Sequence, residues 1–134
     1  MKYLSDIPKP ESFIYLASPY SDSSPLVRII RHAQVEWVVH NVLSEGIVAY
    51  SPIVYFHPTA TKYDLDLDNS YWNQFNETFI QICSEIWVLM LEGWEESEGV
   101  KWELELSRKL HIPERFIYLS SHNEIMVMDE KDGS

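Results

Sequence analysis

Short apolar runs alternate with longer segments of helical periodicity along this chain. Four runs are continuously apolar and end at polar or turn residues: 13–17, 47–50, 86–91 and 116–119. Such runs are typical of strands that are buried on both faces, as in a parallel sheet. A fifth run, 125–128, is expected to form an edge strand.

Three segments place apolar residues at the three- and four-residue spacing of one helical face. The first begins at Ser24, an N-cap residue followed by Pro25, and ends at Gly46. The others cover about 69–83 and 97–110. Residues 53–68 show no clean period and are expected to form a long loop, of the kind that is often functional.

Strands that alternate with helices predict βαβ units. We therefore expect one α/β domain over residues 1–134, a three-layer, flavodoxin-like sandwich whose mainly parallel sheet has four or five strands. Residues 1–12 are expected to form an extended lead-in and 129–134 a flexible tail. Ligands of such sheets bind beyond the carboxyl ends of the strands, which points to the loops 18–21 and 92–97.

Composition removes several classes of function. Lys and Arg number 10 against 21 Asp and Glu, a net charge of -11, which argues against long nucleic acids and anionic membranes as partners. One cysteine allows no intramolecular disulfide and no cysteine-based zinc site. The four glycines, at positions 46, 93, 99 and 133, do not have the spacing of a dinucleotide-binding loop or a phosphate-binding loop. Without an apolar span or a leader-like start, a cytoplasmic protein is expected.

Metal and cofactor sites are not expected. The run Asp64-x-Asp66-x-Asp68 resembles the start of a calcium loop, but Asn69 and Phe75 stand where that loop needs Gly and Glu, which favours a solvated acidic loop. The five histidines show no ligand spacing. Only His57 is kept as a candidate pocket residue.

The start of the helix at 97–110 carries the clearest candidate chemistry. Ser97 as N-cap leaves backbone N–H groups free near Gly99, which together with the helix dipole can hold an anion. Glu103 lies one turn deeper on the same side, within reach of a ligand held there. The alternative interpretation is an ordinary capped surface helix with an acidic first turn.

Three stretches taken together resemble the nucleoside 2-deoxyribosyltransferase superfamily, and within it a small bacterial and phage branch of unknown function. They are Tyr-Leu-Ala-Ser-Pro-Tyr-Ser at 15–21, Ser-Pro-Ile at 51–53, and Trp-Val-Leu at 87–89 with Gly-Trp-Glu-x-Ser-x-Gly-Val-x-x-Glu at 93–103. The likeness runs from Phe13 to about Leu119.

The resemblance implies cleavage or transfer at the N-glycosidic bond of a (deoxy)nucleoside or its 5′-monophosphate, with Glu103 as nucleophile. A glycosyl-enzyme forms, and another base or water then takes the sugar. Asn76 is the second expected catalytic residue. The substrate-binding residues expected on pattern and resemblance are Ser18, Pro19, Tyr20, Ser21, His57, Trp94, Ser97 and Gly99. Homodimers or higher homo-oligomers are also implied.

Two departures from the superfamily leave alternatives open. Asn76 and Ser84 stand where relatives usually carry Asp, and an amide cannot protonate a leaving base. The chain could instead be a nucleotide-binding module without catalysis, or an interaction protein that packs Trp94 and Trp102 against a partner. For Glu103 we expect a raised pKa that still leaves it mostly ionised at neutral pH. The base, the sugar, the phosphate and the acceptor remain open.

Overall fold

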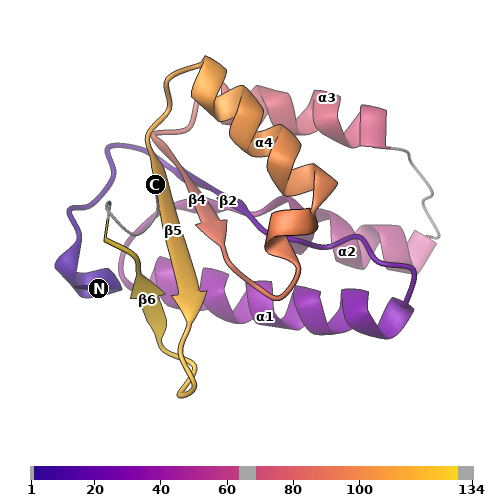
Figure 1. Cartoon of the computed structure of the whole chain (residues 1–134), viewed down its shortest axis with the longest axis horizontal. Coiled ribbons are helices and arrows are strands. Elements are labelled where there is room, and N and C mark those ends of the chain that lie inside the picture. The colour runs from indigo at the N-terminus through magenta and orange to yellow at the C-terminus, as the bar shows by residue number, and fades with distance from the viewer. Residues whose placement is uncertain (1, 64–68, 130–134) are drawn as a thin grey trace.

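A six-stranded sheet with helices on both faces organises the chain (Figure 1). The computed structural model describes residues 2–63 and 69–129. In chain order the elements are β1 (Lys2–Tyr3), the 3₁₀ helix η1 (Leu4–Asp6), β2 (Ile14–Ala17), α1 (Pro25–Ser44), β3 (Ala49–Tyr50), α2 (Pro52–Tyr63), α3 (Asn69–Ile80), β4 (Glu85–Leu89), the 3₁₀ helix η2 (Trp94–Glu96), α4 (Glu98–Lys109), β5 (Glu114–Leu119) and β6 (Ile125–Val127). The α/β class is confirmed.

The sheet itself corrects the sequence-based expectation, because it is mixed rather than mainly parallel. Its order is β1-β6-β5-β4-β2-β3, in which β3, β2, β4 and β5 are parallel while β6 and β1 are antiparallel to their neighbours. A short hairpin causes the reversal at β6: Ser120 N–H donates to the Glu124 carbonyl, and Asn123 takes a φ of 59°. So short a connection permits only antiparallel pairing.

The amino-terminal residues are also more structured than the expected extended lead-in. Lys2 and Tyr3 pair with β6, so β1 forms the edge of the sheet and β6 does not. Leu4 and Ile7 are buried in the core. No apolar run marks a strand of two residues, so its pairing depends on contact with β6 rather than on local sequence.

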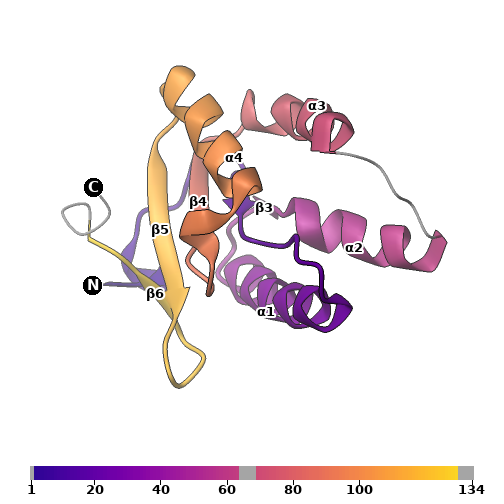
Figure 2. The same cartoon turned by 45° about the vertical axis from the view of Figure 1, so that its right-hand side comes forward.

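Alternating side chains of the strands divide the core into two layers. Ile14 and Leu16 of β2 pack with Val38 and its neighbours on α1, together with Ile53 at the start of α2. The side chains between them face the opposite way and pack against α3 and α4, where Ile80, Val100 and Leu104 are buried. Figure 2 shows that α1 and α2 lie together, apart from α3 and α4.

Capping residues start two of the predicted helices where the sequence placed them. Ser24 accepts a hydrogen bond from Val27 N–H at the start of α1, and Ser97 accepts one from Val100 N–H at the start of α4. Gly46, with a φ of 78°, follows the end of α1 in the left-handed conformation that glycine tolerates.

The prediction of a long loop at 53–68 is wrong for most of that range, because residues 52–63 form α2. Ser51 accepts from Val54 N–H at 3.2 Å, so Ser51 and Pro52 start this helix as Ser24 and Pro25 start α1. Pro58 inside the helix masked the pattern in the sequence. The three aspartates of the calcium-like run lie outside the described residues, as does the tail beyond Asp129.

Candidate functional site

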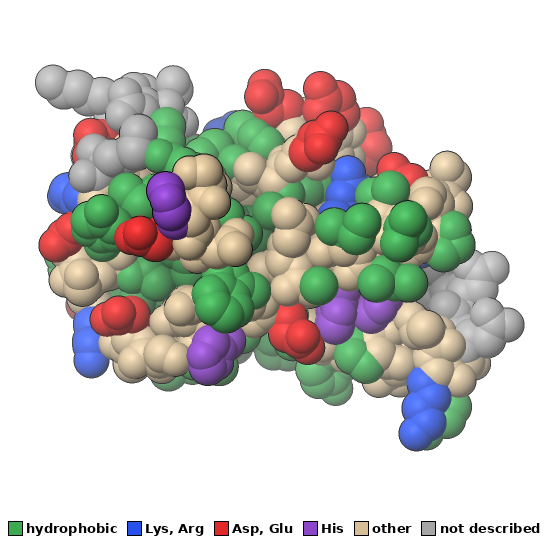
Figure 3. Space-filling model, turned by 90° about the horizontal axis from the view of Figure 1, so that it is seen from below, with side chains coloured by type: hydrophobic (Ala, Val, Ile, Leu, Met, Phe, Trp, Pro, Cys, Tyr) green, Lys and Arg blue, Asp and Glu red, His purple; other side chains and the backbone are tan. Residues whose placement is uncertain are grey.

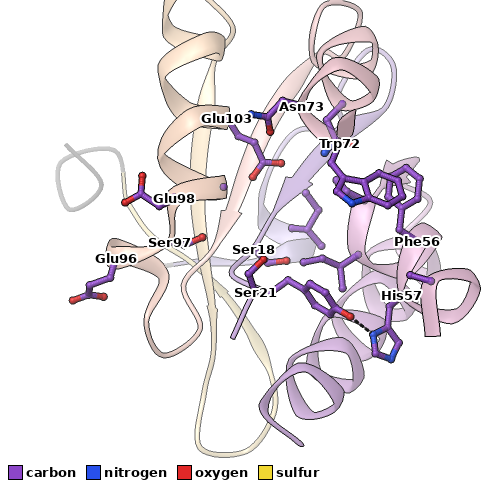
Figure 4. A pocket seen from close by; sticks show the side chains of 17 residues that line it. Ser18, Ser21, Phe56, His57, Trp72, Asn73, Glu96, Ser97, Glu98 and Glu103 are labelled. Atoms are coloured by element: carbon purple, nitrogen blue, oxygen red, sulfur yellow. Dashed lines mark hydrogen bonds between the residues drawn. The ribbon is translucent and has the colours of Figure 1, made fainter. Parts of the chain in front are cut away.

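A pocket of about 400 Å³ opens at the carboxyl ends of β2 and β4 (Figure 4). These two strands are parallel neighbours, but the chain leaves β2 toward β3 on one side and continues from β4 to β5 on the other. Such a reversal of strand order opens a crevice in which α/β proteins bind ligands. The lining residues are Leu16, Ser18, Tyr20, Ser21, Pro52, Ile53, Phe56, His57, Ala60, Trp72, Asn73, Asn76, Glu96, Ser97, Glu98, Gly99 and Glu103.

Glu103 is the one lining carboxylate that is buried, with 7% of its surface exposed. Its position in the second turn of α4 sets it over β2, where the Tyr15 hydroxyl donates a hydrogen bond to its Oε2 atom. Burial raises the pKa of Glu103 to about 8, and the bond from Tyr15 opposes this rise. Burial and the neighbouring carboxylate likewise raise the pKa of Tyr15.

A pKa of about 8 contradicts the expectation of a mostly ionised carboxylate at neutral pH. Loss of hydration alone is enough to raise it. Neighbouring acidic side chains are not its cause, because Glu105 is exposed on α4, and Glu96 and Glu98 point away from the centre of the pocket in Figure 4.

Polar atoms without partners surround this carboxyl group. Ser18 Oγ, Asn76 Oδ1 and the Tyr50 hydroxyl are buried and find no hydrogen-bond partner in the part of the chain that the structure describes. Ser18 and Asn76 line the pocket, and the Tyr50 ring lies 5.7 Å from that of Tyr15. Buried polar atoms are normally satisfied, so these are places where a ligand can donate or accept.

Aromatic side chains form the opposite wall of the pocket. Phe56 of α2 and Trp72 of α3 lie with ring centroids 3.9 Å apart. Nearby, the Tyr20 hydroxyl bonds to His57 Nδ1, and the His57 ring stacks on His32 at 4.2 Å. Burial, followed by the charge of His32, lowers the pKa of His57, which favours a neutral imidazole in this bond with Tyr20.

The start of α4, at Ser97 to Gly99, forms the third side of the pocket. Ser97 Oγ is used in capping, where it accepts from Val100 N–H at 3.2 Å. A Cβ added at Gly99 would meet only Ser97 Oγ, at 3.8 Å, so packing does not require glycine there. Glu98 turns toward Lys101, 3.7 Å away. The backbone at Gly99 is thus open to the pocket.

The pocket brings together most of the residues that the sequence selected. Glu103, Asn76, Ser18, Tyr20, Ser21, His57, Ser97 and Gly99 all line it. Pro19 and Trp94 do not line it: Pro19 is buried within the loop 18–21, and the Trp94 ring packs 5.7 Å from that of Phe116. Ser84 lies at the opposite end of the sheet, where its Oγ accepts from Ser12 N–H.

Several pocket residues had no usable signal in the sequence. Tyr15 lies within an apolar run and was indistinguishable from core, because only the packing of α4 on β2 brings it to Glu103. Phe56 belongs to the helix expected to be a loop. Asn73 and Trp72 share α3 with Asn76 and could have been found from helical spacing.

The family model described as a domain of unknown function, DUF1937, matches residues 12–120. The chain belongs to the DUF1937 family. All residues that line the pocket fall within the matched region, so the pocket belongs to the DUF1937 domain itself. The description of DUF1937 carries no activity. A comparison with curated proteins finds no match.

Over residues 2–63 and 69–129, no three side chains among His, Cys, Asp and Glu lie close enough together to bind a metal ion. No helix in that part of the chain is long and apolar enough to cross a membrane. The DUF1937 pocket itself presents carboxyl, hydroxyl, amide and aromatic groups.

The raised pKa of Glu103 predicts a pH-dependent cost to stability. Between an unfolded value near 4.5 and a folded value of about 8, the folded state retains a proton that the unfolded state loses. The contribution of this carboxyl group to the free energy of unfolding is therefore present below about pH 4.5 and is lost as pH rises toward 8. Relative to Glu103→Gln, the wild type should lose roughly 1 kcal/mol per pH unit between about pH 5 and 7.5.

Urea unfolding of both proteins across this range measures the difference. Glu105→Gln is the matched control, because it removes an exposed carboxylate from the same helix and should follow the wild type at every pH. A constant difference between Glu103→Gln and the wild type would show that Glu103 is ionised throughout.

Proposed function

We propose that this protein cleaves or transfers at the N-glycosidic bond of a (deoxy)nucleoside or its 5′-monophosphate, with Glu103 as the nucleophile. The observation that carries the proposal is a carboxyl group buried in a pocket of about 400 Å³, held by Tyr15 and beside the unpartnered polar atoms of Ser18 and Asn76. The type of reaction is suggested by the resemblance to the nucleoside 2-deoxyribosyltransferase superfamily. Membership of the DUF1937 family neither supports nor opposes this reaction.

The reaction runs in two steps. The Glu103 carboxylate attacks the anomeric carbon, the bond to the base nitrogen breaks, and its electron pair leaves with the base, which takes a proton from solvent. Water or a second base then attacks the same carbon and releases the carboxylate. Tyr15 orients the attacking oxygens through its hydrogen bond.

The walls of the pocket suit the two halves of a nucleoside. Sugar hydroxyls both donate and accept, so they can pair with Ser18 Oγ and Asn76 Oδ1 beside Glu103. A planar base can stack against the aromatic wall of Phe56 and Trp72. A 5′-phosphate, where present, would lie at the open backbone near Gly99.

The flavodoxin-like arrangement belongs to the same proposal. Its support is the order β3-β2-β4-β5 of the four parallel strands, which places the first strand of the series between the second and third. The antiparallel β6 and β1 extend the far edge of this sheet and take no part in lining the pocket.

Asn76 supports a second candidate, a module that binds a nucleoside or nucleotide without turning it over. Its side chain is buried in the pocket, but an amide cannot protonate a departing base. Nor is the Glu103 carboxyl mostly ionised in the empty pocket at neutral pH. Both features lower the expected rate, and neither impairs binding.

Replacing the nucleophile should separate catalysis from binding. Glu103→Gln keeps the shape of the side chain and its ability to accept from Tyr15, but removes the attacking oxygen anion. Release of free base from a panel of deoxynucleosides and monophosphates should fall at least about 10³-fold, while binding measured by calorimetry should change little. Glu105→Gln should keep wild-type activity. Full activity in Glu103→Gln would reject the proposed nucleophile.

The rate of base release should rise with pH. Only the ionised carboxylate attacks, and the pKa of Glu103 is about 8, so the rate should rise about tenfold per pH unit below that value and level off above it. Single-turnover measurements from about pH 6 to 9.5 give the profile. A rate that falls as pH rises would instead indicate a group that acts as an acid.

A carboxyl group at position 76 should restore proton donation. We expect Asn76→Asp to raise base release about 10²-fold, the low end for one general acid. Asn73→Asp is the matched control, because it places the same charge one turn away on α3, where it also lines the pocket. An equal gain from both variants would mean that added charge matters and that the position of Asn76 does not.

A further inference from the structure

The buried hydroxyl of Tyr50 has no hydrogen-bond partner among the described residues. Ser18 and Asn76 also carry buried polar atoms without partners, but both of them line the pocket, whereas Tyr50 is not among the lining residues. A substrate in the pocket meets Ser18 and Asn76 directly and does not by itself explain the Tyr50 hydroxyl. Since buried polar groups normally have a partner, this donor requires an explanation of its own.

Tyr50 lies directly beside Tyr15, the residue that donates to Glu103. The two tyrosines are paired positions in the parallel register of β2 and β3, so both side chains leave the sheet on the same face. Their ring centroids are 5.7 Å apart. Helix α4 covers this face and sets the buried carboxyl group of Glu103 over β2. Tyr50 therefore carries the next hydroxyl along the sheet from the one that already holds Glu103.

The ring of Tyr50 is held in place without help from its hydroxyl. It stacks on Phe79 of α3, with ring centroids 4.1 Å apart and an angle of 13° between the planes. The ring of Tyr55 lies 6.4 Å away. These contacts fix the ring and leave the hydroxyl proton free to turn, while the longer side chain of Glu103 can rotate about its own bonds. A hydrogen bond between the two groups therefore needs movement of the carboxyl group and not of the ring.

Electrostatic interactions connect Tyr50 to Glu103 and keep it a donor. Burial raises the pKa of Tyr50, and the charges of Tyr55 and Glu103 raise it further. The hydroxyl therefore keeps its proton throughout the pH range in which Glu103 ionises. Tyr50 can donate to the carboxylate but does not compete with it for a negative charge.

Hydroxyl groups are the donors that the described residues offer to an ionised Glu103. Glu103 is the one buried acidic side chain among these residues, whereas Figure 3 shows Asp and Glu side chains at the surface of one face. Glu96 and Glu98 point away from the centre of the pocket (Figure 4), and no lysine or arginine is among its lining residues. Burial lowers the pKa of His57 and raises the pKa of the Cys83 thiol to about 11, which favours the neutral form of both.

We propose that Tyr50 is a positioning residue for Glu103, and that its hydroxyl donates a second hydrogen bond to the carboxylate once the carboxyl proton has left for solvent. While Glu103 is protonated, Tyr15 is its donor and the Tyr50 hydroxyl stays unpaired. After ionisation, Tyr50 turns its O–H toward the charge, and both tyrosines remain protonated. A hydrogen bond to a charged group is stronger than one to a neutral group, so the second bond favours the ionised form.

The consequence for catalysis rests on the proposed function, in which ionised Glu103 is the nucleophile, but the hydrogen bond itself does not. It holds the carboxylate from the side of β3 while Tyr15 holds it from β2. Two donors on neighbouring strands fix the direction in which the attacking oxygens point.

The pKa of Glu103, measured by carbon-13 NMR of the glutamate side-chain carboxyl groups, tests the proposal without any substrate. The signal of Glu103 is identified by its loss in Glu103→Gln. Tyr50→Phe keeps the stacked ring and removes the donor, so the pKa of Glu103 should be about 1 higher than in the wild type, a roughly tenfold weaker ionisation. Tyr55→Phe is the matched control, because Tyr55 is 61% exposed, and should leave this pKa unchanged. An unchanged pKa in Tyr50→Phe, or an equal rise in Tyr55→Phe, would overturn the proposal.

Two further measurements distinguish positioning from a structural role. At about pH 5, where Glu103 is protonated and the Tyr50 hydroxyl has no partner, Tyr50→Phe should unfold in urea no more easily than the wild type. The rate of base release in Tyr50→Phe should fall about tenfold well below the pKa of Glu103 and match the wild type above it. A rate that is reduced equally at every pH would indicate a general defect and overturn the positioning role.

The two proposals fail separately. A wild type that releases base, together with an unchanged pKa of Glu103 in Tyr50→Phe, overturns the role of Tyr50 and leaves the proposed function standing. A pKa that rises in Tyr50→Phe, in a protein that releases base from no nucleoside or monophosphate, supports the hydrogen bond and overturns the proposed function.

Discussion

The parallel pairing of β2 with β4 is the constraint on which the candidate site depends. Ala17 lies opposite Val88 at the end of this pairing, so the loops that follow both strands leave the sheet at the same edge. The loop after β2 supplies Ser18 and Tyr20, while the segment after β4 turns back as α4 and carries Glu103 over the sheet. Without this register the two groups would not share a pocket.

The same packing sets the chemistry of Glu103. Because α4 lies on the face of β2 that holds Tyr15, the carboxyl group is removed from water and has one strong donor to compensate. One hydrogen bond does not offset the loss of hydration, so the pKa of Glu103 remains high. A protein that uses this residue as a nucleophile keeps it protonated in the empty pocket at neutral pH.

Different pairs of helices cover the two sides of the sheet. Helices α3 and α4 cover the face at which Tyr15 meets Glu103, and α3 contributes Asn76 to the pocket. Helix α1 buries its inner face against the other side and leaves an apolar outer face. Trp94 and Trp102, which the alternative interpretation as an interaction protein packs against a partner, are partly buried against the α4 side of the core, and Trp37 is the exposed tryptophan.

Local patterns in the sequence determined the α/β class, the places of five strands and the starts of α1 and α4, because apolar runs and capping residues act over a few neighbouring residues. They also selected eight pocket residues, since strand ends and a capped helix predict where ligands bind. Only the tertiary structure decided the edge strand β1, the helix around Pro58, and the contact of Tyr15 with Glu103. Each of these depends on residues far apart in the chain, or on packing that overrides a local signal, and neither leaves a periodic trace in the sequence.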